Sequence, residues 1–122
     1  MLKDGIGRVI INISSTPAIV EHIQGAPYTL AKAALIALTK HIATEYGNSN
    51  IRAYTLALGN IATEATLNSM SQEDRKMASE KASMKRWGKP EEVAKIAACM
   101  ASCNFSFTTG NTIVIDGGSV LL

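Results

Sequence analysis

The sequence has few of the features that mark specialised classes of protein. Aromatic residues make up 5% and charged residues 18% of its 122 residues, and the net charge is only +2. Lysines and arginines are scattered along the chain, so no basic stripe predicts nucleic acid and no lysine cluster predicts an anionic membrane. We therefore expect neither nucleic acid nor membrane as a partner.

Long apolar runs and a secretory pattern are also missing. The unbroken apolar stretch at residues 33–38 is far shorter than the roughly 20 residues that cross a bilayer. The start of the chain has a short apolar core broken by Asn12, with no small-residue cleavage pattern after it. We therefore expect a cytoplasmic protein.

Cysteine occurs only twice, at Cys99 and Cys103, in a segment that we interpret as a helix. No His, Asp or Glu cluster near the pair completes a metal-binding set, so no metal site is expected. Free cysteine is among the most buried residue types, and we expect both to be reduced and packed in the interior.

Apolar residues, in contrast, make up 47% of the chain, which is enough for one domain over residues 1–122. Residues 8–14, RVIINIS, are typical of a strand buried on both faces. Residues 28–46 predict a helix that ends at Gly47. Residues 51–58, IRAYTLAL, predict a second strand, which makes a parallel crossover unit. The apolar residues at helical spacing are Leu30, Ala34, Leu35, Leu38 and Ile42.

The segment 64–87 is polar and predicts a short helix that begins at the capping box of Ser71 and Asp74. Three methionines repeat every seven residues there, which on a helix places them on one face; we interpret that face as packing. They are Met70, Met77 and Met84.

The last third of the chain predicts a helix that begins at Pro90 and a third strand at residues 111–118, NTIVIDGG, which ends in paired glycines. The predicted fold is thus an open α/β arrangement of three mainly parallel strands with helices on both faces. Ligands in such sheets bind beyond the carboxyl ends of the strands. Ser14 and Ser15, residues 59–63 and residues 116–118 all follow strands and are expected at those ends.

One group of residues at these ends suits proton transfer. Tyr28 and Lys32 are one helical turn apart, and Ser15 ends the strand that leads to their helix. A lysine ammonium favours the phenolate form of a nearby tyrosine, which could then act as a general acid or base toward an alcohol or carbonyl oxygen. A serine hydroxyl could hold that oxygen. Local chemistry equally allows Tyr28 as a packing anchor, Lys32 as a solvated surface residue and Ser15 as a turn residue.

Five longer motifs decide between these alternatives. RVIINISS, YTLAKAAL, IRAYTLALGNIAT, KRWGKPEEVAKIA and TGNTIVIDGG occur in this order over almost the whole chain. In order and spacing the chain resembles the carboxyl-terminal half of the short-chain dehydrogenase/reductase (SDR) family, and most of all its 3-oxoacyl carrier-protein reductases. The resemblance implies a partial, three-layer Rossmann-like fold that forms the carboxyl-terminal, catalytic half of the family domain.

The resemblance also implies roles for particular residues. Tyr28 of the YxxxK motif would be the acid/base, and Ser15 would orient the substrate. Lys32 would activate Tyr28 and, together with it, contact the nicotinamide ribose of NAD or NADP. Residues 59–63, here called the nicotinamide loop, would carry further cofactor contacts, and residues 64–86 would form a mobile substrate lid. The implied contacts in the loop are Gly59, Ile61 and Thr63.

The implied activity is hydride transfer between NAD or NADP and a secondary alcohol or ketone. The family's Gly-rich phosphate turn and its catalytic Asn would lie before Met1, and the sequence contains no Gly-x-x-x-Gly-x-Gly. We therefore expect the amino-terminal, dinucleotide-binding half to be absent and the chain to be a fragment, a truncated product or one piece of a two-chain enzyme.

Other functions stay open at this stage. The chain could be a non-catalytic SDR-fold protein that acts as an oligomerisation or binding module, or it could bind another small molecule at the strand ends. The strand at residues 8–14 has an edge without a partner, and the helix at residues 28–46 is apolar over much of its surface. We therefore expect a homo-oligomer or a complementing amino-terminal half as partner.

Two departures from the family pattern are local. Leu58 stands where the family usually has proline, which removes a fixed φ before Gly59 and predicts a more mobile nicotinamide loop. Tyr54 stands where asparagine is common. Neither departure removes a reacting group.

Overall fold

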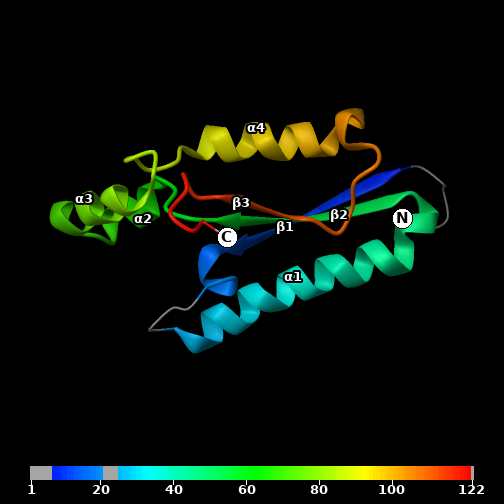
Figure 1. Cartoon of the computed structure of the whole chain (residues 1–122), viewed down its shortest axis with the longest axis horizontal. Coiled ribbons are helices and arrows are strands. Elements are labelled where there is room, and N and C mark those ends of the chain that lie inside the picture. Colours follow the sequence, from blue (N-terminus) through cyan, green and yellow to red (C-terminus); the bar gives the residue numbers. More distant parts are fainter. Residues whose placement is uncertain (1–6, 21–24, 122) are drawn as a thin grey trace.

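The structure, a computed structural model, describes residues 7–20 and 25–121. The residues at the start of the chain, where a secretory pattern was sought, therefore lie partly outside the described part. The described chain forms a three-stranded parallel sheet in the order β1 (Arg8–Ser15), β2 (Ile51–Leu58) and β3 (Thr112–Ile115). Helices α1 (Ala26–Tyr46) and α4 (Pro90–Ala101) cover its opposite faces (Figure 1). The predicted α/β fold with three layers is confirmed.

Shorter elements complete the chain between these layers. Helices α2 (Glu64–Asn68) and α3 (Gln72–Lys81) extend beyond one end of the sheet (Figure 1). The predicted cap of α3 is confirmed, because the Ser71 hydroxyl accepts from the Asp74 amide at 3.1 Å. Helix α2 was not predicted. Three 3₁₀ turns lie at η1 (Thr16–Ala18), η2 (Gly47–Ser49) and η3 (Cys103–Phe105).

The central strand β2 carries the core, and its two faces differ in size. Tyr54 and Leu56 are fully buried and pack with Met100 of α4. The alternating residues Ala53, Thr55 and Ala57 are also fully buried, on the opposite face because side chains alternate along a strand. These small side chains allow α1 to approach the sheet closely.

Strand β1 differs from its prediction. It forms at the predicted place, but it is not buried on both faces: residues 8–12 are only partly buried and Ile13 is 43% exposed. In the described part of the chain β1 pairs only with β2. Ile13 pairs with Leu56 and therefore lies on the same face as α4. The helix, however, lies mainly over β2 and β3 (Figure 1). A strand at the edge of a sheet lacks neighbours to bury it.

Helix α1 contacts the sheet through polar as well as apolar side chains. Thr39 is its one residue that is fully buried, whereas Leu30 is 70% and Leu38 is 45% exposed. The predicted apolar spacing therefore marks the face toward the sheet only in part. Leu35 and Ile42, one turn on either side of Thr39, are partly buried, whereas Leu30, Ala34 and Leu38 are exposed. The helix ends before Gly47 as predicted, although Gly47 itself has helical dihedral angles and Asn50 takes the left-handed conformation.

A buried hydrogen-bond network attaches α1 to both neighbouring strands. The Thr39 hydroxyl accepts from the Asn12 side-chain amide at 2.8 Å and from the Thr55 hydroxyl at 2.7 Å. It donates to the carbonyl oxygen of Leu35 at 2.8 Å. Because Asn12 lies on β1 and Thr55 on β2, one hydroxyl fixes the position of the helix along the sheet.

Two packing predictions are wrong. Met84 lies beyond the end of α3, and Met77 and Met84 are more than half exposed, so the three methionines do not form one packed helix face. Cys99 and Cys103 are free thiols, but both are exposed. Helix α4 packs on the sheet through Val93, Ile96, Ala97 and Met100, and position 99 falls outside that stripe.

Tyr54, the departure from the family pattern, is an anchor for the loop after α4. Its hydroxyl contacts the carbonyl oxygens of Phe105 and Thr108, and its ring meets Phe105 edge-on. Arg52, two residues earlier on β2, donates to the carbonyl oxygens of Met100 and Ser102. A cation at this place is favourable because the carbonyl groups at a helix carboxyl end carry partial negative charge.

The network around Thr39 predicts the effect of a shape-conserving substitution. Thr39→Val should lower the free energy of unfolding by about 1–3 kcal/mol, because it leaves the buried amide of Asn12 and hydroxyl of Thr55 without their acceptor. Urea denaturation measures the loss. The same change at Thr44, which is exposed on the same helix, is the control. Equal effects of the two substitutions would contradict the network.

Candidate active site

The three parallel strands end side by side, which brings three predicted site segments together. Ser15 pairs in register with Leu58, and Leu58 pairs with Ile115. Each of these residues is the last of its strand, so the segments after them leave the sheet at one edge. Ser15, the nicotinamide loop and residues 116–118 therefore lie at the carboxyl ends of the strands, as predicted.

Lys32 is held between α1 and β1 by two hydrogen bonds. Its ammonium group donates to the carbonyl oxygen of Ile13 at 2.9 Å, and its own carbonyl oxygen accepts from the buried Ser14 hydroxyl at 2.8 Å. Sequence reasoning placed Ser14 at this edge but did not predict its contact with the helix. These two bonds direct the lysine side chain toward the end of β1.

Tyr28 lies beside this lysine. The Lys32 ammonium nitrogen is 5.6 Å from the centre of the Tyr28 ring. The tyrosine is 53% exposed, so its side chain is accessible to a molecule outside the chain. The structure thus brings Tyr28 and Lys32 together on one face of α1.

Ser15 lies at the end of the neighbouring strand, but its hydroxyl donates to the carbonyl oxygen of Leu58 at 3.2 Å. That bond ties it to β2 and does not direct it to Tyr28. The convergence of Ser15, Tyr28 and Lys32 on one substrate oxygen therefore stays a prediction. A hydroxyl can exchange such a carbonyl partner for a substrate oxygen by rotating about its side-chain bonds.

The nicotinamide loop lies against β3 and against the start of α4. The Gly59 amide donates to the carbonyl oxygen of Ile115 at 2.9 Å. A Cβ at Gly59 would lie 2.6 Å from the Cβ of Asp116, so no larger residue fits without displacing the backbone. Ile61 is 8% exposed, and the Thr63 hydroxyl caps α2 by accepting from the Thr66 amide. The loop is close-packed at its first and third residues.

Asp116 organises the turn after β3. Its carboxylate accepts from the backbone amides of Gly118 at 2.8 Å and Val120 at 2.7 Å, and from the Ser119 hydroxyl at 2.9 Å. Burial by itself would raise the pKa of Asp116, but these hydrogen bonds outweigh it, so the pKa lies below its usual value. The carboxylate is therefore ionised at neutral pH and fixes the backbone that Gly59 touches.

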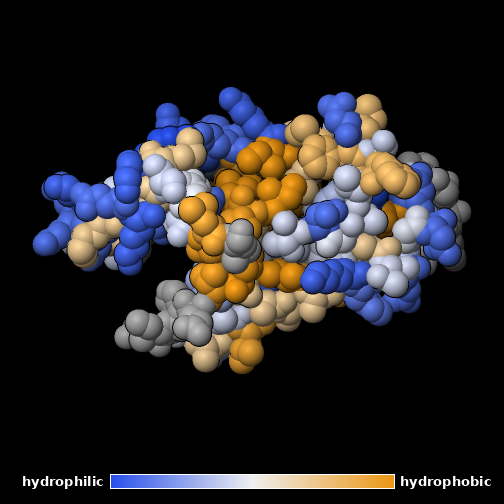
Figure 2. Space-filling model, viewed as in Figure 1, coloured by the Kyte–Doolittle hydropathy of each residue, from blue (hydrophilic) through white to orange (hydrophobic). Residues whose placement is uncertain are grey.

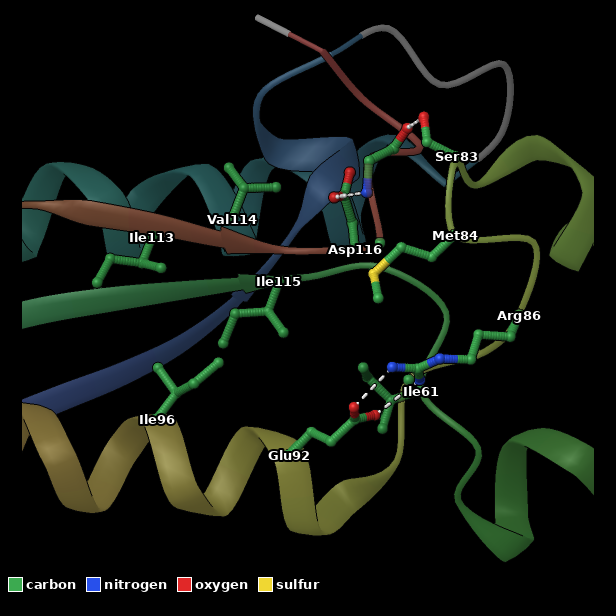
Figure 3. Close-up of a pocket in the computed structure, with 13 residues that line it drawn as sticks. Ile61, Ser83, Met84, Arg86, Glu92, Ile96, Ile113, Val114, Ile115 and Asp116 are labelled. Atoms are coloured by element: carbon green, nitrogen blue, oxygen red, sulfur yellow. Dashed lines mark hydrogen bonds and ion pairs between the residues drawn. The ribbon is translucent and has the colours of Figure 1, made fainter.

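An apolar pocket of about 480 Å³ lies between α4, β3 and the chain around Met84 (Figure 3). Figure 2 shows the hydrophobic side chains that gather there, below α4 on the visible face. Ile61 of the nicotinamide loop is part of its lining, but Ser15, Tyr28 and Lys32 are not. The pocket is thus adjacent to the loop and separate from the residues that the sequence predicts to transfer a proton.

The ion pair of Arg86 and Glu92 was not predicted. The guanidinium contacts both carboxylate oxygens, at 2.9 and 2.7 Å. The hydrogen bond from Arg86, followed by that from the Lys89 amide, lowers the pKa of Glu92 to about 2. The pair is therefore intact at neutral pH. Its contribution to stability declines as the pH falls below about 4.5, and the pair itself is lost as the pH reaches about 2. The sequence signal is an arginine and a glutamate that flank the start of α4.

Within residues 7–20 and 25–121, no three His, Cys, Asp or Glu side chains gather where they could hold a metal ion. None of the helices in the same part of the chain combines the length and apolar character that crossing a bilayer requires.

Comparisons with known proteins bear on this geometry. Residues 1–120 match the family model described as enoyl-(acyl carrier protein) reductase. Glucose 1-dehydrogenase 2 of Bacillus subtilis is 36% identical over 121 residues, which are 99% of this chain and 47% of the relative. The 3-oxoacyl-(acyl-carrier-protein) reductase of Thermotoga maritima is 38% identical over 121 residues, which are 99% of this chain and 48% of the relative.

A solved structure shows the same arrangement of elements. A 4-hydroxyisoleucine dehydrogenase mutant, complexed with NADH and succinate, matches with a TM-score of 0.89 and 33% sequence identity. The match covers 96% of this chain and 49% of that one. The chain thus spans about half the length of the relatives and of the solved structure that it matches.

The close approach of Gly59 to Asp116 predicts the effect of adding one methyl group. Gly59→Ala should lower the free energy of unfolding by about 1–3 kcal/mol, because the new Cβ meets backbone and Cβ atoms that cannot move aside. Gly47→Ala is the matched control, since Gly47 has helical dihedral angles and open space around it. That control should be neutral or stabilising by up to about 1 kcal/mol. Thermal unfolding of the two variants checks the difference, and a neutral Gly59→Ala would show that the loop can move.

Proposed function

The chain belongs to the short-chain dehydrogenase/reductase family, as its motifs predict, and from that premise we propose that it carries the proton-transfer residues of an oxidoreductase that uses NAD or NADP. The reaction would interconvert a secondary alcohol and a ketone. The observation that supports this most is the placement of the Lys32 ammonium beside the exposed Tyr28 ring at the carboxyl end of a parallel sheet.

In this proposal Tyr28 exchanges a proton with the substrate oxygen. The phenol donates its proton to the ketone oxygen during reduction and accepts it back during oxidation. Lys32 supplies the neighbouring positive charge, and its bond to Ile13 keeps that charge close to the phenol. Ser15 donates its hydroxyl to the same substrate oxygen once it leaves the Leu58 carbonyl. The cofactor, when bound, supplies or accepts the hydride.

The described residues fit the nicotinamide end of the cofactor. The nicotinamide loop, with Gly59, Ile61 and Thr63, lies at the same edge of the sheet as Tyr28 and Lys32. Gly59 packs directly on Asp116, which leaves the loop backbone close to the sheet. The NADH in the matching solved structure supports this assignment. The proposal covers both NAD and NADP, because the residues that select between them belong to the adenosine end.

The substrate is proposed as a small alcohol or carbonyl compound. The relatives are named for different substrates, a sugar in one case and an acyl group on a carrier protein in the other. Their common chemistry is the alcohol–carbonyl pair. A homo-oligomer or a complementing amino-terminal half is the proposed partner, since the exposed apolar side chains of Ile13, Leu30 and Leu38 would then be covered.

Titration with cofactor tests this function directly. We expect saturable binding of NADH or NADPH, followed by fluorescence, either by the chain alone or after addition of an amino-terminal half from a relative. Tyr28→Phe should reduce ketone turnover by about 10²–10⁴-fold and weaken cofactor binding far less, because it removes the hydroxyl that exchanges the proton and leaves Lys32 and the nicotinamide loop in place. Tyr46→Phe, at the other end of α1, is the control. No binding up to millimolar cofactor in either form would overturn the proposal.

The exposed apolar side of α1 predicts self-association. Light scattering at micromolar concentration should show a dimer or larger assembly, because Leu30 and Leu38 expose apolar surface that association would bury. The double substitution Leu30→Glu and Leu38→Glu should shift the chain toward monomer, whereas Thr44→Glu on the same helix should not. A monomeric wild-type chain would exclude association through this helix.

A further inference from the structure

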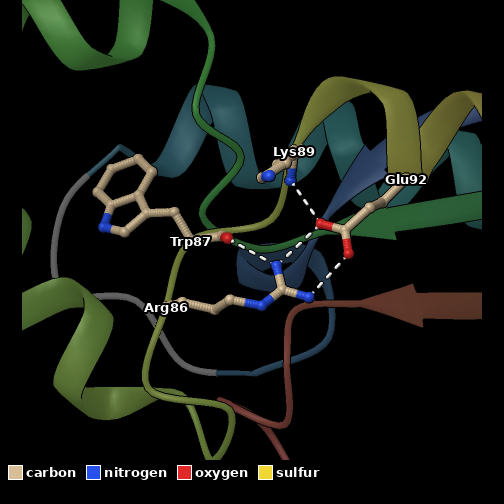
Figure 4. Close-up of polar contacts among 4 residues, drawn as sticks. All are labelled: Arg86, Trp87, Lys89 and Glu92. Carbon is tan, nitrogen blue, oxygen red and sulfur yellow. Dashed lines mark hydrogen bonds and ion pairs between the residues drawn. The ribbon is translucent and has the colours of Figure 1, made fainter.

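The Arg86–Glu92 ion pair connects the residue before the segment 87–89 with the first turn of α4 after it (Figure 4). Besides binding both carboxylate oxygens, Arg86 donates to the carbonyl oxygen of Trp87 at 2.9 Å. The Glu92 carboxylate also accepts from the backbone amide of Lys89 at 2.8 Å. Two side chains thus hold the backbone on both sides of Gly88.

Gly88 in turn holds the nicotinamide loop. Its amide donates to the carbonyl oxygen of Asn60 at 3.0 Å, and its carbonyl oxygen accepts from the Ala62 amide at 2.8 Å. Ile61 and Gly88 form a parallel bridge. A Cβ at Gly88 would lie 2.7 Å from the Cδ1 atom of Ile61, so the two segments touch without space between them.

The same segment is joined to the lid. The indole nitrogen of Trp87 donates to the carbonyl oxygen of Arg75 on α3 at 3.0 Å. Trp87 is the one tryptophan of the sequence. Its emission therefore reports on the place where the lid, the nicotinamide loop and the start of α4 meet.

The ion pair is poorly placed to stabilise the whole fold. The side chains of Arg86 and Glu92 are 43% and 41% exposed, and exposed pairs contribute little to global stability. Two parallel N–H···O bonds nevertheless restrict orientation more than one point contact does. The geometry therefore suits the positioning of a local backbone segment.

We propose that Arg86 and Glu92 are positioning residues, which set the nicotinamide loop in its cofactor-binding place by holding Gly88 against Asn60 and Ala62. The assignment of the loop to the cofactor rests on the proposed function. The mechanical link from the ion pair to the loop does not, because it consists of hydrogen bonds within the chain.

Amide hydrogen exchange on the whole 122-residue chain tests this link. Glu92→Gln should accelerate exchange at the Ala62 and Gly88 amides by about threefold to tenfold, while the amides of β2 stay unchanged. It should also shift the emission of Trp87. Glu91→Gln is the matched control, since Glu91 lies in the same first turn of α4 and is exposed. That control should change neither measurement.

Variants of Arg86 separate the effect of the forked guanidinium contact, in which two nitrogens bind both oxygens of Glu92, from the effect of the positive charge. Arg86→Met should accelerate exchange at least as much as Glu92→Gln, because it removes the bond to the Trp87 carbonyl oxygen as well as the ion pair. The double variant should exceed Arg86→Met by less than the effect of Glu92→Gln alone, because the ion pair is already lost in Arg86→Met. Arg86→Lys should restore only part of the protection, since a lysine cannot contact both oxygens and the Trp87 carbonyl in one plane. Full restoration by lysine would overturn the role of the fork.

Cofactor binding supplies a second readout. Dissociation constants for NADH and NADPH, measured as in the titration above, should rise about threefold to tenfold in Glu92→Gln and stay unchanged in Glu91→Gln. Unchanged exchange at Ala62 and Gly88, or acceleration spread over the whole chain, would overturn the positioning role whether or not cofactor binds. Absence of cofactor binding both by the wild-type chain alone and after addition of an amino-terminal half would overturn the proposed function, and the exchange experiment would still decide the link.

Discussion

The register of three parallel strands, Ser15 beside Leu58 and Leu58 beside Ile115, is the constraint on which the candidate site depends. Because every strand ends in the same row, every segment that follows a strand leaves the sheet at one edge. A shift of one residue between β2 and β3 would move Gly59 away from Asp116, and a shift of one residue in either pair would turn the alternating side chains of the shifted strand to the opposite face. The arrangement of the candidate site is thus a consequence of strand pairing.

Helix α1 is placed on this sheet by hydrogen bonds as well as by apolar contacts. Thr39 binds Asn12 and Thr55 near the middle of the helix, and Ser14 binds the Lys32 carbonyl near its start. Two attachment points along one helix fix both its rotation and its position along the sheet. The Lys32 ammonium is consequently held beside Tyr28, although both residues belong to an otherwise exposed part of the helix.

The nicotinamide loop has a corresponding pair of attachments. Gly59 is fixed to β3, and Asn60 and Ala62 are fixed to Gly88. The first attachment is part of the sheet, whereas the second depends on an exposed ion pair between Arg86 and Glu92. The two attachments of the loop therefore differ in kind, and Trp87, next to the second one, also bonds to Arg75 of α3.

The amino-acid pattern by itself determined the strands, the long helices, their parallel order and the family, because those features depend on local periodicity and on motifs close together in the chain. It also predicted the cap of α3 and the start of α4. Burial was decided only by the tertiary structure. The sequence did not predict that four apolar or sulfur-containing side chains are exposed: Ile13, Leu30, Met84 and Cys99. The exposure of a side chain depends on which element packs against it, and the periodicity of the sequence does not contain that information. The contacts of Ser14, Thr39 and the Arg86–Glu92 pair likewise required elements to meet in space.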